Sequence, residues 1–310
     1  MARFLVFGSV GWDCPVWLDQ PLDSGSRILA FRPQPEQAGL REGRLGGGAA
    51  NAAACLVNAG HDAAVWGVIP NAPVSDQIEN ALSAIGIDYT FLKRAELPNG
   101  TTLILIEPNG ERTIMFEHSD PNLDRSIRRM MKQNIGEIQI GPIQVHRPDG
   151  LFLRALFMGF EGLAELESVS IVAHWPQSKT AAPIPADVLI GSKDDLIEAE
   201  LYSNAFHHGR KACTDRLQAV IVTDGPRGGE VFREKEHSVF QSIGVQQVDA
   251  TGAGDSFAAG VLEALTAGAT IEEAAAHGAR WGAVTASLPG SAEKRAVGTY
   301  EMWTCLDDVR

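Results

Sequence analysis

Short apolar runs rich in β-branched residues alternate along this chain with longer amphipathic segments. The runs predict strands, and the segments, in which apolar residues recur every three or four positions, predict helices. We expect strands at 3–7, 63–68, 169–173, 188–190, 219–223 and 244–248, and helices at 51–59, 75–85, 256–267 and 271–286. Strands that alternate with helices are typical of a mostly parallel central sheet with helices on both faces. The pattern therefore predicts an α/β fold.

Two stretches interrupt this rhythm. Residues 101–107 and 111–117 are extended runs joined by Pro108-Asn109-Gly110, which is typical of a hairpin turn. We expect residues 13–45 and 88–118 to form a small antiparallel β lid, inserted into an α/β body of residues 1–12, 46–87 and 119–310. Such a lid would shield a ligand from water, and the alternative is a surface hairpin without that role. The pattern of residues 127–148 does not assign them to the sheet.

Composition narrows the classes of partner. The chain has 310 residues, and 26 Lys and Arg against 39 Asp and Glu give a net charge of −13. This balance argues against nucleic acid and against an anionic membrane surface as partners. No apolar run approaches the roughly 18 residues of a membrane span. The four cysteines contain no CxxC pair, so we expect reduced thiols and a cytoplasmic protein.

The strongest candidate for chemistry is the segment 249–257, which follows a predicted strand and begins a predicted helix. Its small residues are Gly252, Ala253 and Gly254. They allow backbone amides to converge at a helix N-terminus, where the helix dipole favours anions. Asp255 lies just inside this turn, where a carboxylate can take a proton from an attacking hydroxyl group while the amides neutralise a phosphoryl group. The alternative is that Asp255 or Ser256 caps the helix.

Two further glycine-rich loops support a ligand-binding cleft. Gly46-Gly47-Gly48-Ala49-Ala50-Asn51 precedes a predicted helix, and Thr223-Asp224-Gly225-Pro226-Arg227-Gly228-Gly229 follows a predicted strand. Glycines let a ligand lie against the backbone, and α/β sheets bind ligands at the carboxyl ends of their strands. A cleft for two ligands explains the three loops together. A Walker phosphate loop, a dinucleotide fingerprint, a GxSxG elbow and an HExxH motif are all absent from the sequence.

With these motifs the chain resembles the ribokinase or PfkB family of carbohydrate and nucleoside kinases. The family's C-terminal signature is similar to Asp249-Ala-Thr-Gly-Ala-Gly-Asp255-Ser-Phe257, and its N-terminal signature is matched by Gly46, Gly47 and Asn51. The likeness spans nearly the whole chain, with Gly8 and Asp13 after the first strand and a Thr-x-Gly-x-x-Gly loop at 223–228. It implies a ribokinase-like fold in which a small β lid stands on the α/β body.

The resemblance also implies roles for single residues. Asp255 would be the general base, and Gly252, Ala253 and Gly254 would form the anion hole for the γ-phosphoryl group of ATP. Substrate hydroxyls would be bound by Asp13, Gly46, Gly47 and Asn51. The nucleotide phosphates would lie near Thr223, Gly225 and Gly228. Asp249 and Thr251 correspond to positions that in some relatives help to bind a monovalent cation, such as K⁺.

One motif departs from the family. Where relatives carry Asn-x-x-Glu to organise water around Mg²⁺, this chain has Ser192-Lys193-Asp194-Asp195. Ser192 then stands for the Asn beside the nucleotide, and Asp195 for the Glu that acts on Mg²⁺ through water. The alternative for Asp195 is an acidic residue at a helix N-terminus, and Lys193 and Asp194 are interpreted as a solvated helix start. We expect the shorter carboxylate and the missing amide to reduce metal affinity or activity.

The main hypothesis is an ATP-dependent kinase that phosphorylates a primary hydroxyl group of a sugar or sugar-like polyol. One alternative is a nucleoside kinase of the same family, with lid aromatics Phe31, Phe91 and Phe116 around the base, although aromatics in a hairpin also form lid core. Another is a non-catalytic sugar- or nucleotide-binding member. Arg112 or Arg41 would contact an acidic sugar or lie in solvent. The edges and apolar face of a lid sheet also predict a homodimer formed through the lid.

Overall fold

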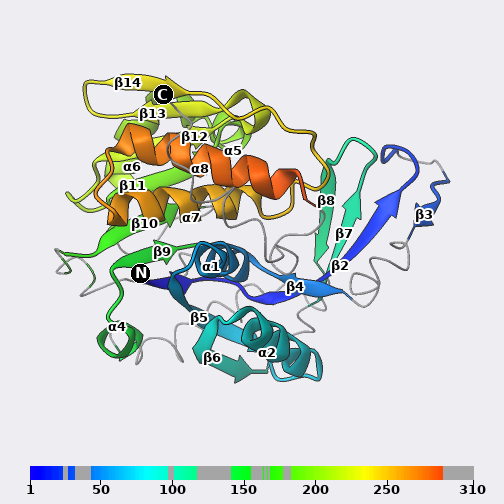
Figure 1. The fold of residues 1–310 in the computed structure, drawn as a ribbon. Coiled ribbons are helices and arrows are strands. Elements are labelled where there is room, and N and C mark those ends of the chain that lie inside the picture. Colours follow the sequence, from blue (N-terminus) through cyan, green and yellow to red (C-terminus); the bar gives the residue numbers. More distant parts are fainter. Residues whose placement is uncertain are drawn as a thin grey trace.

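The computed structural model describes residues 1–23, 27–31, 43–96, 101–116, 141–154, 163, 166, 168–176 and 183–288. They form a nine-stranded sheet flanked by helices and a separate five-stranded sheet. In Figure 1 the smaller sheet stands to the right of the helix-covered body. The predicted α/β class, with a small sheet beside a large, mostly parallel one, is confirmed.

The large sheet has the order β14-β13-β12-β11-β10-β9-β1-β5-β6. Its strands are β1 (Arg3–Phe7), β5 (Asp62–Pro70), β6 (Asp88–Ala95), β9 (Gly150–Leu153), β10 (Ser170–His174), β11 (Val188–Ser192), β12 (Ala219–Thr223), β13 (Gly229–Phe232) and β14 (His237–Phe240). From β12 to β6 every neighbouring pair is parallel, whereas β13 and β14 run antiparallel at one edge. The parallel strands therefore end along one common edge, where α/β sheets bind ligands.

Helices cover both faces of this sheet. They are α1 (Gly48–Asn58), α2 (Val74–Ile85), α4 (Gly141–His146), α5 (Lys193–Glu198), α6 (Ala205–Ala212), α7 (Ala253–Thr266) and α8 (Ile271–Ala286), with 3₁₀ turns η3 (Tyr202–Asn204) and η4 (Gly225–Arg227). Successive side chains of a strand point to opposite faces. In β1, Phe4 and Val6 join the core beneath α1, α2, α7 and α8, and Leu5 and Phe7 join the core on the side of α4 to α6.

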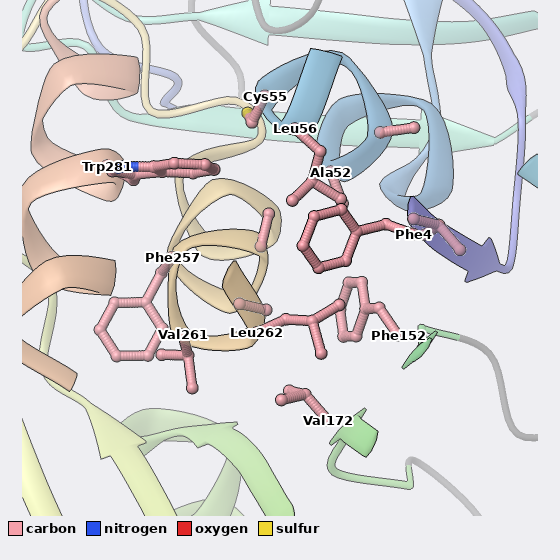
Figure 2. Close-up of a cluster of buried hydrophobic side chains, with 14 of the residues drawn as sticks. Phe4, Ala52, Cys55, Leu56, Phe152, Val172, Phe257, Val261, Leu262 and Trp281 are labelled. Atoms are coloured by element: carbon pink, nitrogen blue, oxygen red, sulfur yellow. The ribbon is translucent and has the colours of Figure 1, made fainter. Parts of the chain in front are cut away.

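The first of these cores holds α7 against the sheet (Figure 2). Leu262 of α7 packs among Phe4 and Phe152 of the central strands, and all three are fully buried. Helix α8 approaches α7 closely, because a Cβ atom at Gly278 would lie 2.6 Å from the carbonyl oxygen of Phe257. Close packing on both sides fixes the direction of α7, and with it the position of the glycine-rich turn at its start.

The small sheet contains β2 (Gly11–Leu18), β3 (Ala30–Phe31), β4 (Arg44–Gly46), β7 (Thr101–Ile106) and β8 (Arg112–Phe116). Strands β7 and β8 form the predicted hairpin, whose turn uses Gly110 at a φ of 82° and a hydrogen bond from the amide of Glu111 to Oδ1 of Asn109. β2 pairs with β7 in parallel, whereas the pairs β2–β3, β2–β4 and β7–β8 are antiparallel.

Two expectations differ from the structure. Residues 88–95 form β6, which pairs with β5 in the large sheet, so they lie in the body and not in the lid. Residues 244–248 do not form the predicted strand, because the amides of Val248 and Asp249 donate to the carbonyl of Ala286 at the end of α8 instead of to a neighbouring strand. Parts of 13–45, 88–118 and 127–148 lie outside the described residues.

Among the residues that the structure describes, no helix combines the length and apolar character needed to cross a bilayer.

Candidate active site

The glycine-rich turn before α7 lies at the carboxyl edge of the large sheet. Gly252 adopts a φ of 77° and precedes the first residue of the helix. The amide of Ala253 donates to the carbonyl of Ala250 at 3.1 Å, which leaves the amides of Gly252, Gly254 and Asp255 without a backbone acceptor among the described residues. The turn thus offers free N–H groups at the positive end of α7, although Ala253, one of the three residues predicted to form the anion hole, does not supply one.

Asp255 lies in the first turn of α7 and is almost fully buried. Its Oδ2 accepts a hydrogen bond from Nδ2 of Asn51 at 3.0 Å, and its Oδ1 accepts one from Nε of Arg154 at 2.6 Å. Burial raises the pKa of this carboxyl group, but the charge of Arg154 and the two hydrogen bonds outweigh burial and hold the pKa below its ordinary value. Asp255 is therefore ionised at neutral pH and able to accept a proton.

Asp13, Gly46 and Gly47 lie on one side of Asp255. Asp13 is buried in β2, and a Cβ atom at Gly46 in β4 would lie only 2.1 Å from Cγ of Asp13, so Gly46 makes room for this carboxylate. A Cβ atom at the neighbouring Gly48 would lie 2.9 Å from Oδ1 of Asp255. The N-terminal glycine segment thus borders Asp255, and Asn51 bonds directly to it, as expected for one site.

A cavity of about 230 Å³ borders the α7 turn. Its lining includes the predicted nucleotide residues Thr223, Gly225 and Gly228 and the turn residues Ala253 and Gly254. Apolar surface dominates its wall, to which α7 and α8 contribute Phe257, Ala279 and Ala283. The segment 242–245, which was expected partly as strand, lines the cavity as well. Apolar walls with a few polar groups are typical of pockets for small-molecule ligands and cofactors.

Asp249 and Thr251 are both buried, and Asp249 forms an ion pair with Arg44. Arg44 of β4 is fully buried, and its Nη2 lies 2.9 Å from Oδ2 of Asp249. Oδ1 of the same carboxylate accepts the amide of Thr251 at 2.9 Å. Burial raises the pKa of Asp249, and the charge of Arg44 together with these hydrogen bonds lowers it below the ordinary value. A guanidinium group therefore already neutralises this carboxylate.

Two residues of the site were not predicted from the sequence. Arg154 follows β9, and His174 ends β10, so both stand at the carboxyl edge of the sheet. Burial and the nearby charge of Arg154 lower the pKa of His174 to about 4, so it is neutral at pH 7. In the sequence each of these residues is only a single polar residue beside an apolar run. Arg154, for example, interrupts the apolar run 151–160 and belongs to no motif.

Comparison with known proteins gives the family. The family model described as "pfkB family carbohydrate kinase" matches residues 26–134 and 185–296, which is well over half of the chain. The chain belongs to the pfkB family of carbohydrate kinases. Members of this family are phosphotransferases that act on an alcohol group, and this protein is an enzyme of that class.

Three relatives of this pfkB protein are distant in sequence and align with almost all of it. An ATP-dependent ribose-1-phosphate kinase of Halopiger xanaduensis is 25% identical over 301 residues, which is 94% of each chain. The structure of a ribokinase from Giardia lamblia aligns with a TM-score of 0.71 at 16% identity and covers 94% of this chain and 95% of that one. A Burkholderia thailandensis nucleoside kinase in complex with inosine aligns with a TM-score of 0.70 at 16% identity, over 93% and 92% of the two chains. These structural likenesses support the fold.

The departure from the family's Asn-x-x-Glu motif is visible at the start of α5. Ser192 is the N-cap of this helix, and its Oγ accepts the amide of Asp195 at 3.1 Å. Asp195 itself is exposed. Lys193 is not the solvated residue that we expected, because its Nζ lies 3.1 Å from Oδ2 of Asp224 and 3.5 Å from Oε1 of Glu230. The hydrogen bond to Asp224 raises the pKa of Lys193 and ties α5 to the loop after β12.

Proposed function

We propose that this protein transfers the γ-phosphoryl group of ATP to a primary hydroxyl group of a sugar or sugar-like polyol. The observation that carries the proposal is the place of Asp255. Gly48 of the N-terminal glycine segment borders its carboxylate, the free amides of the turn before α7 adjoin it in the chain, and Ala253 and Gly254 of that turn line an apolar cavity. A base between an acceptor site and an anion site is what phosphoryl transfer to an alcohol requires.

The cavity fits the nucleotide. In our proposal the adenine ring lies between the loop of Thr223, Gly225 and Gly228 and the α8 residues that line the apolar wall. The triphosphate then extends past Gly254, where a Cβ atom would meet nothing within 4 Å, toward the start of α7. The free amides of Gly252 and Gly254 and the helix dipole supply positive potential without basic side chains. This resolves how a chain of net charge −13 binds a polyanion.

In our proposal the acceptor binds on the side of Asp255 away from the nucleotide. Its hydroxyl groups there form hydrogen bonds with Asp13, Gly46, Gly47 and Asn51. Asp255 takes the proton of the reacting hydroxyl group, whose oxygen forms a bond to the γ-phosphorus as the bond from that phosphorus to the β,γ-bridging oxygen breaks. ADP leaves with that oxygen, and the phosphorylated alcohol is the second product. The low pKa of Asp255 keeps it ionised before the transfer.

The site offers Mg²⁺ one carboxylate at the start of α5. Mg²⁺ in nucleotide enzymes uses one or two carboxylates together with substrate phosphates and water, and the exposed Asp195 is the carboxylate available at the start of α5. Among the described residues no group of three or more potential ligands gathers. Bound Mg²⁺ would neutralise the developing charge on the phosphates. Ser192 is occupied as a helix cap, so we expect it to position Asp195 and not the metal.

The monovalent cation proposed at Asp249 and Thr251 has a competitor in the structure. Both carboxylate oxygens of Asp249 already accept hydrogen bonds, one of them from the guanidinium group of Arg44. We infer that Arg44 supplies the positive charge that K⁺ provides elsewhere. The expected result is equal activity with K⁺ and with a bulky organic cation at the same ionic strength. A rise of tenfold or more with K⁺ would contradict this inference.

The experiment for the proposed function is an ATP-consumption screen with Mg²⁺ over sugars, sugar acids, sugar phosphates, polyols and nucleosides, with product mass as the second readout. We expect one acceptor class to gain a phosphate on a primary hydroxyl group. The matched control is the Asp255→Asn variant, which should bind ATP but consume little of it. Acceptor binding without ATP consumption across the whole panel would instead identify a non-catalytic binding protein.

A nucleoside acceptor is the second candidate, because the inosine-bound Burkholderia enzyme shares the fold. One of the three aromatics proposed to hold a base is excluded, since Phe91 lies in β6 of the large sheet with its ring against that of His146. Phe31 and Phe116 end strands of the lid, and Arg112 is exposed at the hairpin, while Arg41 lies outside the described residues. A preference of the screen for nucleosides would establish this candidate.

We also retain the proposed homodimer through the lid. Leu103 and Met115 are cross-strand partners on β7 and β8, and 37% and 51% of their surfaces are exposed. In our proposal this apolar pair belongs to the surface that a second copy of the chain covers. Sedimentation velocity should give a dimer that Met115→Glu dissociates, and a wild-type monomer at micromolar concentration would contradict it.

A further inference from the structure

Arg154 is the one charged side chain that the central strand β9 delivers directly to the site. Its amide donates to the carbonyl of Phe7 at 2.8 Å, which continues the pairing of β9 with β1 by one residue. Its Cβ lies 2.9 Å from where a Cβ of Gly8 would stand, and its Nε lies 2.5 Å from the corresponding point at Gly48. Two glycines thus provide the space in which this side chain reaches Asp255.

The guanidinium group retains unused hydrogen-bonding capacity. Its Nε donates to Asp255 at 2.6 Å, whereas its two terminal amino groups make no hydrogen bond to any residue that the structure describes. The side chain is 31% exposed, and its terminal nitrogens are not among the buried polar atoms without a partner, so these donors are accessible to solvent. A planar guanidinium fork matches the two oxygens of a carboxylate or a phosphate better than it matches neutral hydroxyl groups.

A purely orienting role does not explain the choice of arginine. Asn51 already holds the second oxygen of Asp255, and a neutral donor in place of Arg154 would orient the first without a charge. A cation beside a general base makes that base weaker, because it favours the ionised form. An anion that engages the guanidinium group would offset this effect at the moment when the acceptor is in place.

The other basic side chains that the structure describes near the site are not available to bind an anionic group of the acceptor. Lys193 is neutralised by Asp224 and Glu230 on the nucleotide side, and Arg44 is neutralised by Asp249. The nearby His174 is neutral at pH 7, because burial and the charge of Arg154 lower its pKa to about 4.

We propose that Arg154 is a specificity-determining residue that binds an anionic group of the acceptor, so that the substrate is a sugar acid or a sugar phosphate. The proposal rests on the proposed function, whose acceptor class it names. The shared chemistry is a planar or tetrahedral oxyanion attached to a polyol. The acceptor carries this group within reach of Arg154 while its primary hydroxyl group faces Asp255.

The test compares acceptors that differ only in charge. For one carbon skeleton, kcat/KM is measured for the carboxylate, the neutral alcohol and the phosphate ester, with wild-type protein, Arg154→Gln and the control Arg94→Gln. Arg94 of β6 is a matched control, because it is a comparably exposed arginine that forms ion pairs with Asp76 and Glu79 of α2, outside the site. We expect wild-type protein to prefer one anionic acceptor, and Arg154→Gln to lower the anionic-to-neutral ratio of kcat/KM by about 10- to 100-fold.

The two anionic arms separate a sugar acid from a sugar phosphate. A second variant, Arg154→Lys, keeps the charge without the fork. Its anionic-to-neutral ratio of kcat/KM should lie between those of wild type and Arg154→Gln, and it also covers the case in which the glutamine variant fails to fold.

If Arg154→Gln lowers kcat/KM equally for charged and neutral acceptors, Arg154 serves Asp255 or the transferred phosphoryl group and the proposal is wrong, while the proposed function stands. If wild-type protein prefers neutral acceptors, the proposal for Arg154 is likewise wrong while the proposed function stands. If wild-type protein binds ATP but phosphorylates no acceptor, the proposed function fails and this proposal with it.

Discussion

Glu263 in α7 provides a quantitative test of how the scaffold behind the site is held together. Its Oε1 lies 3.3 Å from Nε2 of His61, and its Oε2 lies 3.0 Å from Nε2 of His277 in α8. Nδ1 of His61 accepts the amide of Ala2, so the ring proton is on Nε2 and is donated to Glu263. One carboxylate therefore joins the start of β1, the loop after α1 and helix α8.

The magnitude follows from the pKa of this group. Burial raises the pKa of Glu263, but its contacts with His277 and His61 outweigh burial and lower it from 4.5 to about 2. A carboxyl group with a depressed folded-state pKa stabilises the fold above its unfolded-state pKa, and this stabilisation is lost as pH falls toward the folded-state value. For Glu263 the window runs from about 4.5 down to about 2, and the full contribution at pH 7 is at most about 3 kcal/mol.

The perturbation is Glu263→Gln, measured by urea unfolding at pH 7 and at pH 3.5, with the exposed Glu234→Gln as control. We expect the free energy of unfolding to fall by about 1–3 kcal/mol at pH 7, because glutamine keeps the shape but not the charge. At pH 3.5 the difference from wild type should narrow by about 1 kcal/mol, since the unfolded wild-type chain then binds the proton. A difference that is constant over this range, or a variant as stable as the control, would refute the reasoning.

Three further substitutions test other contacts. Arg44→Met should lower the free energy of unfolding by about 3–5 kcal/mol in urea titration, because it removes the cation that compensates the buried Asp249 carboxylate, and a loss below about 1 kcal/mol would contradict this. Gly46→Ala would place a Cβ atom 2.1 Å from Cγ of Asp13 and should raise the KM for the acceptor about tenfold in steady-state assays, with the Kd of ATP unchanged in calorimetry. Ala283→Trp should fill the cavity of about 230 Å³ and weaken ATP binding in calorimetry at least about tenfold, and unchanged ATP affinity would place the nucleotide elsewhere.

Local patterns were sufficient for much of the fold. The helix predicted at 271–286 is α8 with the same ends, because Thr270 and Glu273 form a capping box at its start. The run at 219–223 is β12, a strand buried on both faces. The hairpin was predicted from its turn residues, which fix the backbone independently of distant contacts.

Other elements depend on contacts that no local pattern encodes. β2 contains Pro15 and becomes a strand through its pairing with β7, which lies about 90 residues further along the chain. Residues 244–248 have the composition of a strand, yet the amides of Val248 and Asp249 donate to the carbonyl of Ala286 at the end of α8. The same limit applies to the site. The glycine loops and Asp255 form a recognisable sequence motif, whereas Arg154 reaches Asp255, and the buried Arg44 reaches Asp249, from distant strands whose neighbours are known only in the folded chain.

The central claim is that Asp255 is the base of a phosphoryl transfer. Its most direct test is the single-turnover rate of Asp255→Asn with saturating ATP and the best acceptor of the panel, together with ATP affinity by calorimetry. Asparagine preserves the size of the side chain and one acceptor oxygen but cannot take the proton. We predict a rate lower by about 100-fold or more at nearly unchanged ATP affinity. A rate within about threefold of wild type, in a variant that binds ATP normally, would contradict the account.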